Sequence, residues 1–236
     1  MTQHTSEVLF QAIEDTWPAQ EYSKTGGFHI GRDPASQRTS SARLISSDYD
    51  IPLAENAFTS WGQTPIFMVT KSDGSLDHDL QERGYQIKDP VNLMSCPVSD
   101  LANDAPPPVS MFTPWPMLAI QREIWTDAGI GPERHKIMQR PTGHKTTILS
   151  RWDDKPTGTA FVATSGNLAI LHALELRPEH RRKGIASWMV KTAARWAKPL
   201  GCDHLVVLVT TANIGAMSLY TSLGFETVEH YHYRKK

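Results

Sequence analysis

The sequence contains few cysteines, little net charge and no long apolar run. Only two of its 236 residues are cysteines, Cys96 and Cys202, which are too few for the disulfide framework of a small secreted domain. The formal net charge of −1 does not favour nucleic acid or an acidic membrane surface as a partner. No apolar run reaches the ~20 residues that a membrane-spanning helix needs.

The ends of the chain carry no targeting or metal-binding signal either. Residues 1–7 lack the basic and apolar blocks of a secretory signal peptide. His230 and His232 alternate along a predicted strand with no acidic or cysteine partner nearby in the sequence, so no metal site is predicted. We therefore expect a cytoplasmic protein, and the basic tail 234–236 is interpreted as solvated.

What the sequence does contain is a basic loop between a strand and a helix. An apolar strand is predicted over 168–176 and a helix from Ile185 onward. The segment Arg181-Arg182-Lys183-Gly184 joins them. Three cations, a helix N-terminus and a glycine that lets a ligand approach the backbone all suit a pyrophosphate. The spacing differs from a nucleotide P-loop, and a solvated basic turn is the alternative interpretation.

The residues after this loop continue the alternation of helices and strands. Apolar residues at helical spacing over 185–196 predict a helix that packs one face on a sheet. The run 204–210 predicts a buried central strand. A short helix is predicted between Asn213, which suits an N-cap, and a stop at Gly224, before a final strand over 226–233.

Two motifs in this order resemble the GNAT superfamily of acetyl-CoA-dependent N-acetyltransferases. They are R-x-x-G-x-[GA] at residues 181–186 and N-x-x-A-x-x-L-Y-x-x-x-G-F at residues 213–225. The resemblance covers the second half of the chain, with Ala186 where many members have glycine. It implies an α/β fold of the GNAT type with a mixed sheet. It also implies transfer of an acetyl group from acetyl-CoA to a primary amine in a ternary complex.

The resemblance further implies where acetyl-CoA binds. Backbone groups near Leu174 and Leu176 would hydrogen-bond the pantetheine arm, and a backbone N–H there would face the thioester oxygen. The other residues implied to contact the cofactor are Arg181, Arg182, Lys183, Gly184, Ile185, Ala186, Asn213 and Ala216. Capping of the helix alone would explain Asn213 equally well.

Three residues are candidates for moving protons. Tyr220 stands where the superfamily places its general acid, and a phenol with a pKa near ~10 stays protonated at neutral pH. Packing against its neighbours is the structural alternative. His172 resembles the strand histidine of the arylalkylamine acetyltransferase branch and suits a general base, with Glu175 as its rival. Strand alternation puts these two on opposite faces unless a bulge intervenes, as is common in the family, and a water chain could replace both.

The first half of the chain lacks the basic loop. Helices are predicted near 6–16, 52–61 and 76–84, and strands near 27–32, 41–46, 65–70 and 91–97. The segment Leu80-x-x-x-Gly-Tyr85 echoes the C-terminal motif. We therefore predict two tandem copies: a degenerate GNAT-like domain at 1–98, a proline-rich linker at 99–110 and a catalytic domain at 111–236. An unrelated α+β cap is the alternative, and the two cysteines are expected in different domains.

The acceptor is left open by the sequence. In the superfamily one wall of the acceptor site follows the first strand, so Trp115, Trp125 and His135 are candidates, although Trp125 also suits a core position. The expected partner is a small-molecule amine or peptide amine, without nucleic acid or membrane, and a homodimer stays open. The competing functions are a non-catalytic acyl-CoA-binding regulatory module, transfer of another acyl group, or acetylation of a protein N-terminus.

Overall fold

The computed structural model describes residues 4–236, which divide by their contacts into two compact units. Unit 1 comprises the N-terminal residues up to Pro18 together with Leu93–Val209 and Ile214–Val228. Unit 2 comprises Ala19–Asn92, Thr210–Asn213 and Glu229–Lys236. Two strands, β5 (Gln86–Pro97) and β11 (Glu226–Lys235), begin in one unit and end in the other.

Unit 1 is built on a mixed sheet with the strand order β5-β10-β9-β8-β7-β6. Its other strands are β6 (Met111–Phe112), β7 (Lys145–Trp152), β8 (Lys155–Ser165), β9 (Leu168–Leu176) and β10 (His204–Thr210). The pairs β6–β7, β7–β8 and β8–β9 are antiparallel, whereas β9 and β10 are parallel. This arrangement confirms the predicted α/β class.

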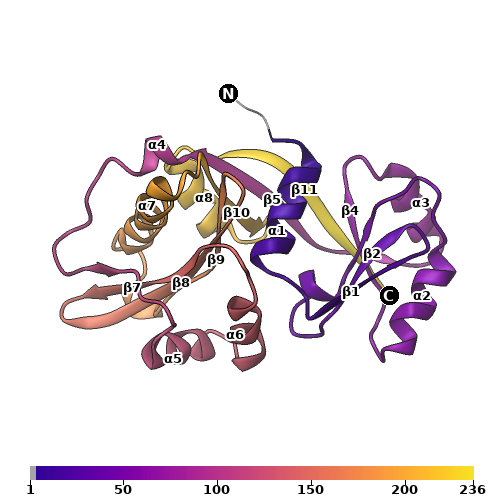
Figure 1. The fold of residues 1–236 in the computed structure, drawn as a ribbon, viewed down its shortest axis with the longest axis horizontal. Coiled ribbons are helices and arrows are strands. Elements are labelled where there is room, and N and C mark those ends of the chain that lie inside the picture. The colour runs from indigo at the N-terminus through magenta and orange to yellow at the C-terminus, as the bar shows by residue number, and fades with distance from the viewer. Residues whose placement is uncertain (1–3) are drawn as a thin grey trace. The chain divides into compact units, whose positions relative to one another are not determined.

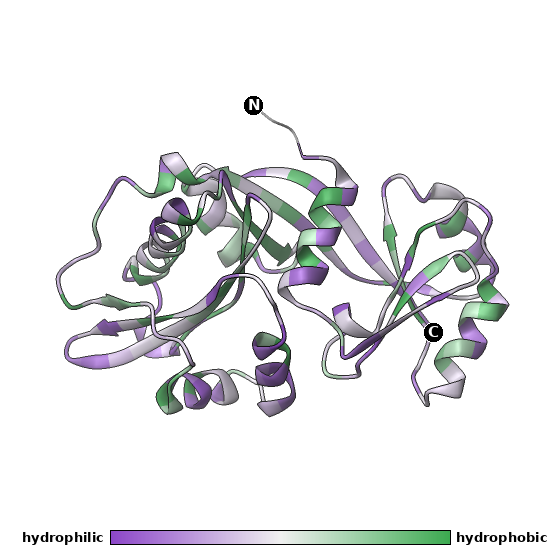
Figure 2. Ribbon diagram, in the orientation of Figure 1, coloured by the Kyte–Doolittle hydropathy of each residue, from purple (hydrophilic) through white to green (hydrophobic). Residues whose placement is uncertain are grey.

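Helices cover both faces of this sheet. They are α1 (Ser6–Thr16), α4 (Val98–Leu101), α5 (Ala119–Asp127), α6 (Pro132–Gln139), α7 (Ile185–Ala197) and α8 (Ile214–Ser222), with 3-10 turns at Pro178–His180 and Lys198–Leu200. Figure 1 shows α7 beside the strands of this sheet. Its buried face, including Met189 and Val190, belongs to the same hydrophobic core as Ala160 and Val162 of β8. Hydrophobic and hydrophilic residues alternate along α1 (Figure 2), whose apolar side contacts β8 and β9. The apolar faces of the helices thus enclose the β-branched strands.

Unit 2 has a smaller mixed sheet with the order β1-β2-β3-β4-β11. Its strands β1 (Glu21–Thr25), β2 (Phe28–Arg32) and β3 (Ala42–Leu44) are antiparallel, β3 is parallel to β4 (Ile66–Thr70), and β4 is antiparallel to β11. The helices are α2 (Ile51–Ser60) and α3 (Gly74–Glu82), with a 3-10 turn at Arg38–Ser40. Phe28, Phe58, Phe67, Leu76 and Leu80 form the centre of its core.

The two units repeat one series of elements. The series β1-β2-β3-α2-β4-α3-β5 in the first half matches β7-β8-β9-α7-β10-α8-β11 in the second, with the same parallel pair in its middle. From α3 onward the elements begin 140 residues apart, at 74 and 214 for the helices and at 86 and 226 for the last strands. The last strands change places, because β11 pairs with β4 and β5 lies beside β10.

The contact-defined units cut across the predicted ranges 1–98, 99–110 and 111–236. Helix α1 belongs to unit 1 because it packs on β8 and β9, and the end of β11 belongs to unit 2 because it pairs with β4. The proline-rich segment lies within unit 1. Cys96 and Cys202 are both buried free thiols in unit 1, so the expectation that they lie in different domains is wrong.

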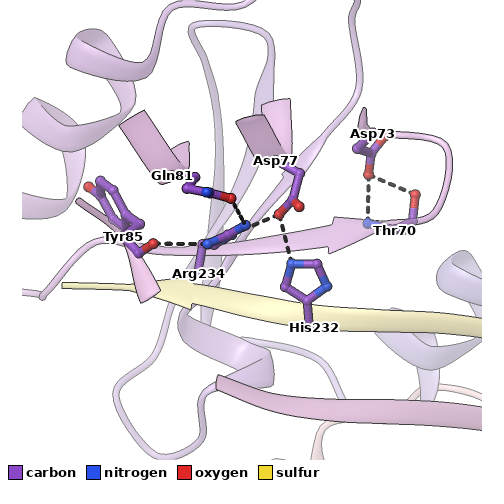
Figure 3. Close-up of polar contacts among 7 residues, drawn as sticks. All are labelled: Thr70, Asp73, Asp77, Gln81, Tyr85, His232 and Arg234. Atoms are coloured by element: carbon purple, nitrogen blue, oxygen red, sulfur yellow. Dashed lines mark hydrogen bonds and ion pairs between the residues drawn. The ribbon is translucent and has the colours of Figure 1, made fainter. Parts of the chain in front are cut away.

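The interpretation of the tail 234–236 as solvated is wrong for Arg234, and His232 gains a distant partner. Arg234 is only 4% exposed, and its guanidinium donates to Asp77 Oδ1 at 2.7 Å, to the Tyr85 carbonyl at 3.0 Å and to Gln81 Oε1 at 3.3 Å (Figure 3). His232 has an acidic partner, because its Nε2 lies 2.8 Å from the same Asp77 oxygen. The pairing of β11 with β4 brings these residues together although they are far apart in the sequence.

Candidate functional site

A β-bulge interrupts β9 just before its C-terminal end. His172 lies opposite Phe161 and Glu175 lies opposite Thr159, so three steps along β9 match two along β8. The backbone of Ala173 has a φ of +49°, a left-handed conformation that costs a residue with a Cβ about 1–2 kcal/mol. Residues that face each other across antiparallel strands point to the same side of a sheet. The bulge therefore puts the side chains of His172 and Glu175 on one face.

The strands β9 and β10 separate at the same place. Their pairing joins residues 168–171 to residues 204–207, although β9 runs on to Leu176 and β10 to Thr210. Backbone groups of β9 beyond the bulge thus have no ladder partner on β10 within the described residues. An extended ligand can use such groups as if it were an added strand.

The basic loop has the backbone of an anion site. Gly184 is the N-cap of α7 with a φ of +76°, and Arg182 is also left-handed, with a φ of +64°. A Cβ built on Gly184 would meet no atom within 4 Å, and no side chain caps the helix. The first N–H groups of a helix lack partners within the helix, so those of α7 are available to phosphate oxygens. The side chains of Arg181, Arg182 and Lys183 are exposed around them.

The Glu175 carboxylate influences the ionisation of the Tyr220 phenol. Tyr220 lies on α8, is 8% exposed and packs on Phe225 with ring centroids 5.4 Å apart. Burial, with the Glu175 carboxylate as a second cause, raises the pKa of Tyr220 to about 12. Burial also raises the pKa of Glu175, and the nearby Arg181 partly offsets that rise. The phenol therefore stays protonated at neutral pH, while the carboxylate is a stronger base than an ordinary one.

His172 sits in a closed environment. It is 5% exposed, and its Nε2 lies 3.0 Å from Thr16 Oγ1. The Thr16 hydroxyl also lies 2.7 Å from the Ala12 carbonyl, to which it donates, so the imidazole is linked to the helix α1 through this hydroxyl. The imidazole ring also lies against Trp17, with centroids 5.0 Å apart. These contacts favour a structural role for His172.

Four of the other predicted residues have side chains that pack in or against the core. Leu174 and Leu176 of β9 and Ala216 of α8 pack partly buried against the core, and the Ile185 side chain is buried in it. Backbone atoms are thus what these residues can offer to a ligand on the strand and at the start of α7. Ala186 is half-buried in the first turn of α7. Asn213 directly precedes α8, and its N–H donates to the Thr210 carbonyl at 2.9 Å.

The candidates for the acceptor wall differ in burial. Trp125 is fully buried, as its core alternative predicts, and its ring contacts His135, with centroids 5.7 Å apart. Burial lowers the pKa of His135. Trp115 is half-buried near Phe161. Sequence reasoning did not identify Ala173, because an alanine in a left-handed conformation leaves no signal in the sequence.

Two other kinds of feature are absent from residues 4–236. That part of the chain has no cluster of three or more His, Cys, Asp or Glu residues able to hold a metal ion. It also has no helix with the length and apolar character needed to span a membrane.

Known proteins share this sequence pattern and fold. The family model described as the acetyltransferase (GNAT) family matches residues 113–225. An uncharacterized N-acetyltransferase of Bacillus subtilis (strain 168), YobR, is 26% identical over 94% of each chain. The aminoglycoside N(6')-acetyltransferase type 1 of Acinetobacter genomosp. 13 is 33% identical over 57% of this chain and 97% of its own. The structure of a GCN5-related N-acetyltransferase from Kribbella flavida matches with a TM-score of 0.72 at 18% identity, covering 96% of this chain and 94% of its own.

Proposed function

Because the chain belongs to the GNAT acetyltransferase family, we propose that it transfers an acetyl group from acetyl-CoA directly to an amine in a ternary complex. The observation that carries this proposal is the open, bulged end of β9. It leads to the helix N-terminus at Gly184, and the Glu175 carboxylate near its end raises the pKa of Tyr220. Groups suited to binding the cofactor, to polarising the thioester carbonyl and to transferring protons thus all belong to unit 1.

The chain can hold acetyl-CoA with groups that suit each of its parts. The N–H groups at the start of α7 and the three cations 181–183 bind the pyrophosphate. Backbone groups of residues 174–176 bind the pantetheine arm, and one N–H there stabilises the charge that develops on the thioester oxygen. Bound in this way, acetyl-CoA supplies an activated acetyl group.

We assign the two proton transfers to Glu175 and Tyr220. The carboxylate of Glu175, with its raised pKa, accepts the proton that the amine nitrogen loses as its bond to the acetyl carbon forms. The hydroxyl of Tyr220 donates a proton to the CoA sulfur as the carbon–sulfur bond breaks. His172 supports the strand from its closed environment rather than acting as the base.

The acceptor we propose is a small-molecule amine. The relative that is 33% identical is named an aminoglycoside acetyltransferase, and such acceptors carry primary amines. Peptide amines are the alternative class. The first experiment incubates the full chain with acetyl-CoA and a panel of small amines, including aminoglycosides and polyamines. Release of CoA thiol together with an acetylated amine supports the proposal; binding of acetyl-CoA without thiol release favours the regulatory module.

A second experiment separates the two candidate bases by the pH dependence of kcat/KM. For the wild type we expect activity to fall at acid pH as Glu175 becomes protonated, at a pH above its usual pKa. Glu175→Gln should lower kcat and remove this fall in kcat/KM at acid pH, the acid limb of the profile. His172→Asn should keep the acid limb, measured on the fraction of this variant that folds. A limb that survives in Glu175→Gln and disappears in His172→Asn would make His172 the base.

A further inference from the structure

The bulge at Ala173 needs a partner that keeps it in place. A left-handed alanine tends to relax toward extended backbone, and relaxation would slip the register of β9 by one residue. Such a slip would turn the side chain of Glu175 to the other face of the sheet. The groups assigned to catalysis would then no longer lie together.

Trp125 supplies a contact suited to this task. Its indole Nε1–H donates to the Ala173 carbonyl at 2.8 Å, from the helix α5 to the bulged strand. The ring is fully buried, so its indole N–H cannot be satisfied by bulk water and needs an acceptor within the protein. The Ala173 carbonyl is that acceptor, and the bond between them favours the bulged conformation.

The indole ring is itself held in position. The Trp125 backbone carbonyl accepts from the N–H of Ile130 at 2.7 Å and from Ala128 at 3.1 Å, which closes the end of α5. The ring of His135 on α6 lies against it, with centroids 5.7 Å apart. A donor fixed at both its backbone and its ring can place a carbonyl accurately.

We propose that Trp125 is a positioning residue, which holds the bulge at Ala173 and thereby sets the placement of the oxyanion-binding backbone and of Glu175. This inference rests on the proposed acetyl transfer for its effect on turnover. It does not rest on that function for its effect on the backbone. A residue of this kind influences kcat, while the pyrophosphate contacts at α7 that hold the cofactor are left intact.

The test is Trp125→Phe, which keeps a large ring and removes the N–H. We expect kcat to fall by about tenfold to 100-fold, since small misplacements of reacting groups have effects of that size. The Kd of acetyl-CoA, measured by calorimetry, should change less than kcat, because the pyrophosphate contacts at α7 remain while only the pantetheine contacts of residues 174–176 shift. Hydrogen exchange in a peptide covering residues 171–176 should become faster. Trp152→Phe is the matched control, because Trp152 packs against the core of the same unit but lies at the end of β7, opposite Lys155.

A second variant distinguishes positioning from general loss of stability. Glycine adopts left-handed backbone without strain, so Ala173→Gly in the Trp125→Phe background should restore much of kcat. Restoration supports the proposal, because it would not be expected if Trp125 only stabilised the core. Unchanged exchange at residues 171–176 in Trp125→Phe overturns it, as does an unchanged kcat. If the wild type transfers no acetyl group, the proposed function fails while the exchange measurement still tests the bulge.

Discussion

The helices α2 and α7 occupy the same place in the two repeated series, yet their N-termini differ. Gly184 begins α7 without a side-chain cap and follows three cations. Asp50 begins α2, and its carboxylate accepts from the Leu53 N–H at 2.8 Å, while Pro52 has no N–H to offer. The positive end of α2 is therefore already satisfied by a carboxylate of the protein, which also repels phosphate. One scaffold thus carries an open anion site in one copy and a closed one in the other.

The two short helices α3 and α8 end in the same backbone geometry but differ in a side chain near that end. Gly84 and Gly224 have nearly the same φ, +84° and +85°, and the residue after each donates to the carbonyl four positions before the glycine, at 3.0 Å. These equivalent positions are Leu80 and Tyr220. Leucine offers no proton to a leaving group. We propose that the first half is a degenerate repeat, with neither the cofactor loop nor the acid, so that each chain has one active site.

The strongest test of the difference between the helix N-termini is Gly184→Val. A side chain there strains the left-handed backbone and fills the space that a phosphate needs. We expect acetyl-CoA affinity to fall by about 100-fold or more, because several charge-assisted hydrogen bonds are lost together. Calorimetric titration measures this directly.

The control for that variant is Gly201→Val. Gly201 also has a positive φ, +81°, and open space around its position, but it follows α7 rather than preceding it. Both variants should lose similar stability, and only Gly184→Val should lose the ligand. Retained binding in Gly184→Val would remove the loop from the proposed cofactor site.

The second test addresses the acid. Tyr220→Phe removes the hydroxyl and keeps the ring packed on Phe225, so kcat should fall by about 100-fold or more while acetyl-CoA affinity is retained. Tyr85→Phe removes a buried hydroxyl from the other half, where it donates to Glu55 at 2.6 Å. That control should affect stability and leave kcat unchanged. Equal turnover in Tyr220→Phe and wild type would contradict the assigned role.

Local pattern predicted much of the fold, because most elements have strong periodicity and clear ends. The helices α1, α2 and α7 and the strands β9 and β10 lie within a residue or two of the predicted bounds. The strand β1 was not predicted, since its residues are mostly exposed and it lacks the apolar alternation of a half-buried strand. The loop at Gly184 could be identified because its chemistry is contained in consecutive residues.

The sequence could not show what depends on distant partners. In the sequence, Arg234 and His232 are polar residues near the end of the chain. Only the structure, in which β11 pairs with β4, shows that both contact Asp77. Whether the side chains of His172 and Glu175 lie on the same face of the sheet depends on a bulge that no residue type in the sequence indicates. The sequence also could not show that β5 and β11 exchange places. The two strands have similar residue patterns, so the pattern does not say beside which strand each of them pairs.

The smallest expected effect concerns the exchanged strand β11. Arg234→Met removes the buried guanidinium and leaves the Tyr85 carbonyl and the Asp77 carboxylate without that donor. We expect the free energy of unfolding, measured with urea, to fall by about 2–4 kcal/mol. The control is Lys235→Met, which also removes one positive charge. Lys235 faces the other side of the strand, so its loss should matter much less.

The same contact predicts a pH dependence that the variant loses. The hydrogen bond from Arg234 holds the pKa of Asp77 below its usual value, and His232 acts in the same direction. Asp77 therefore stabilises the fold above its unfolded pKa of ~3.9, and this contribution is lost as pH falls through the lower folded value. The stability difference between wild type and Arg234→Met should narrow at acid pH. The folded Arg234→Met variant should keep its kcat at neutral pH, because Arg234 stabilises the half of the chain that has no cofactor loop. A large loss of turnover would show that this half also contributes to catalysis.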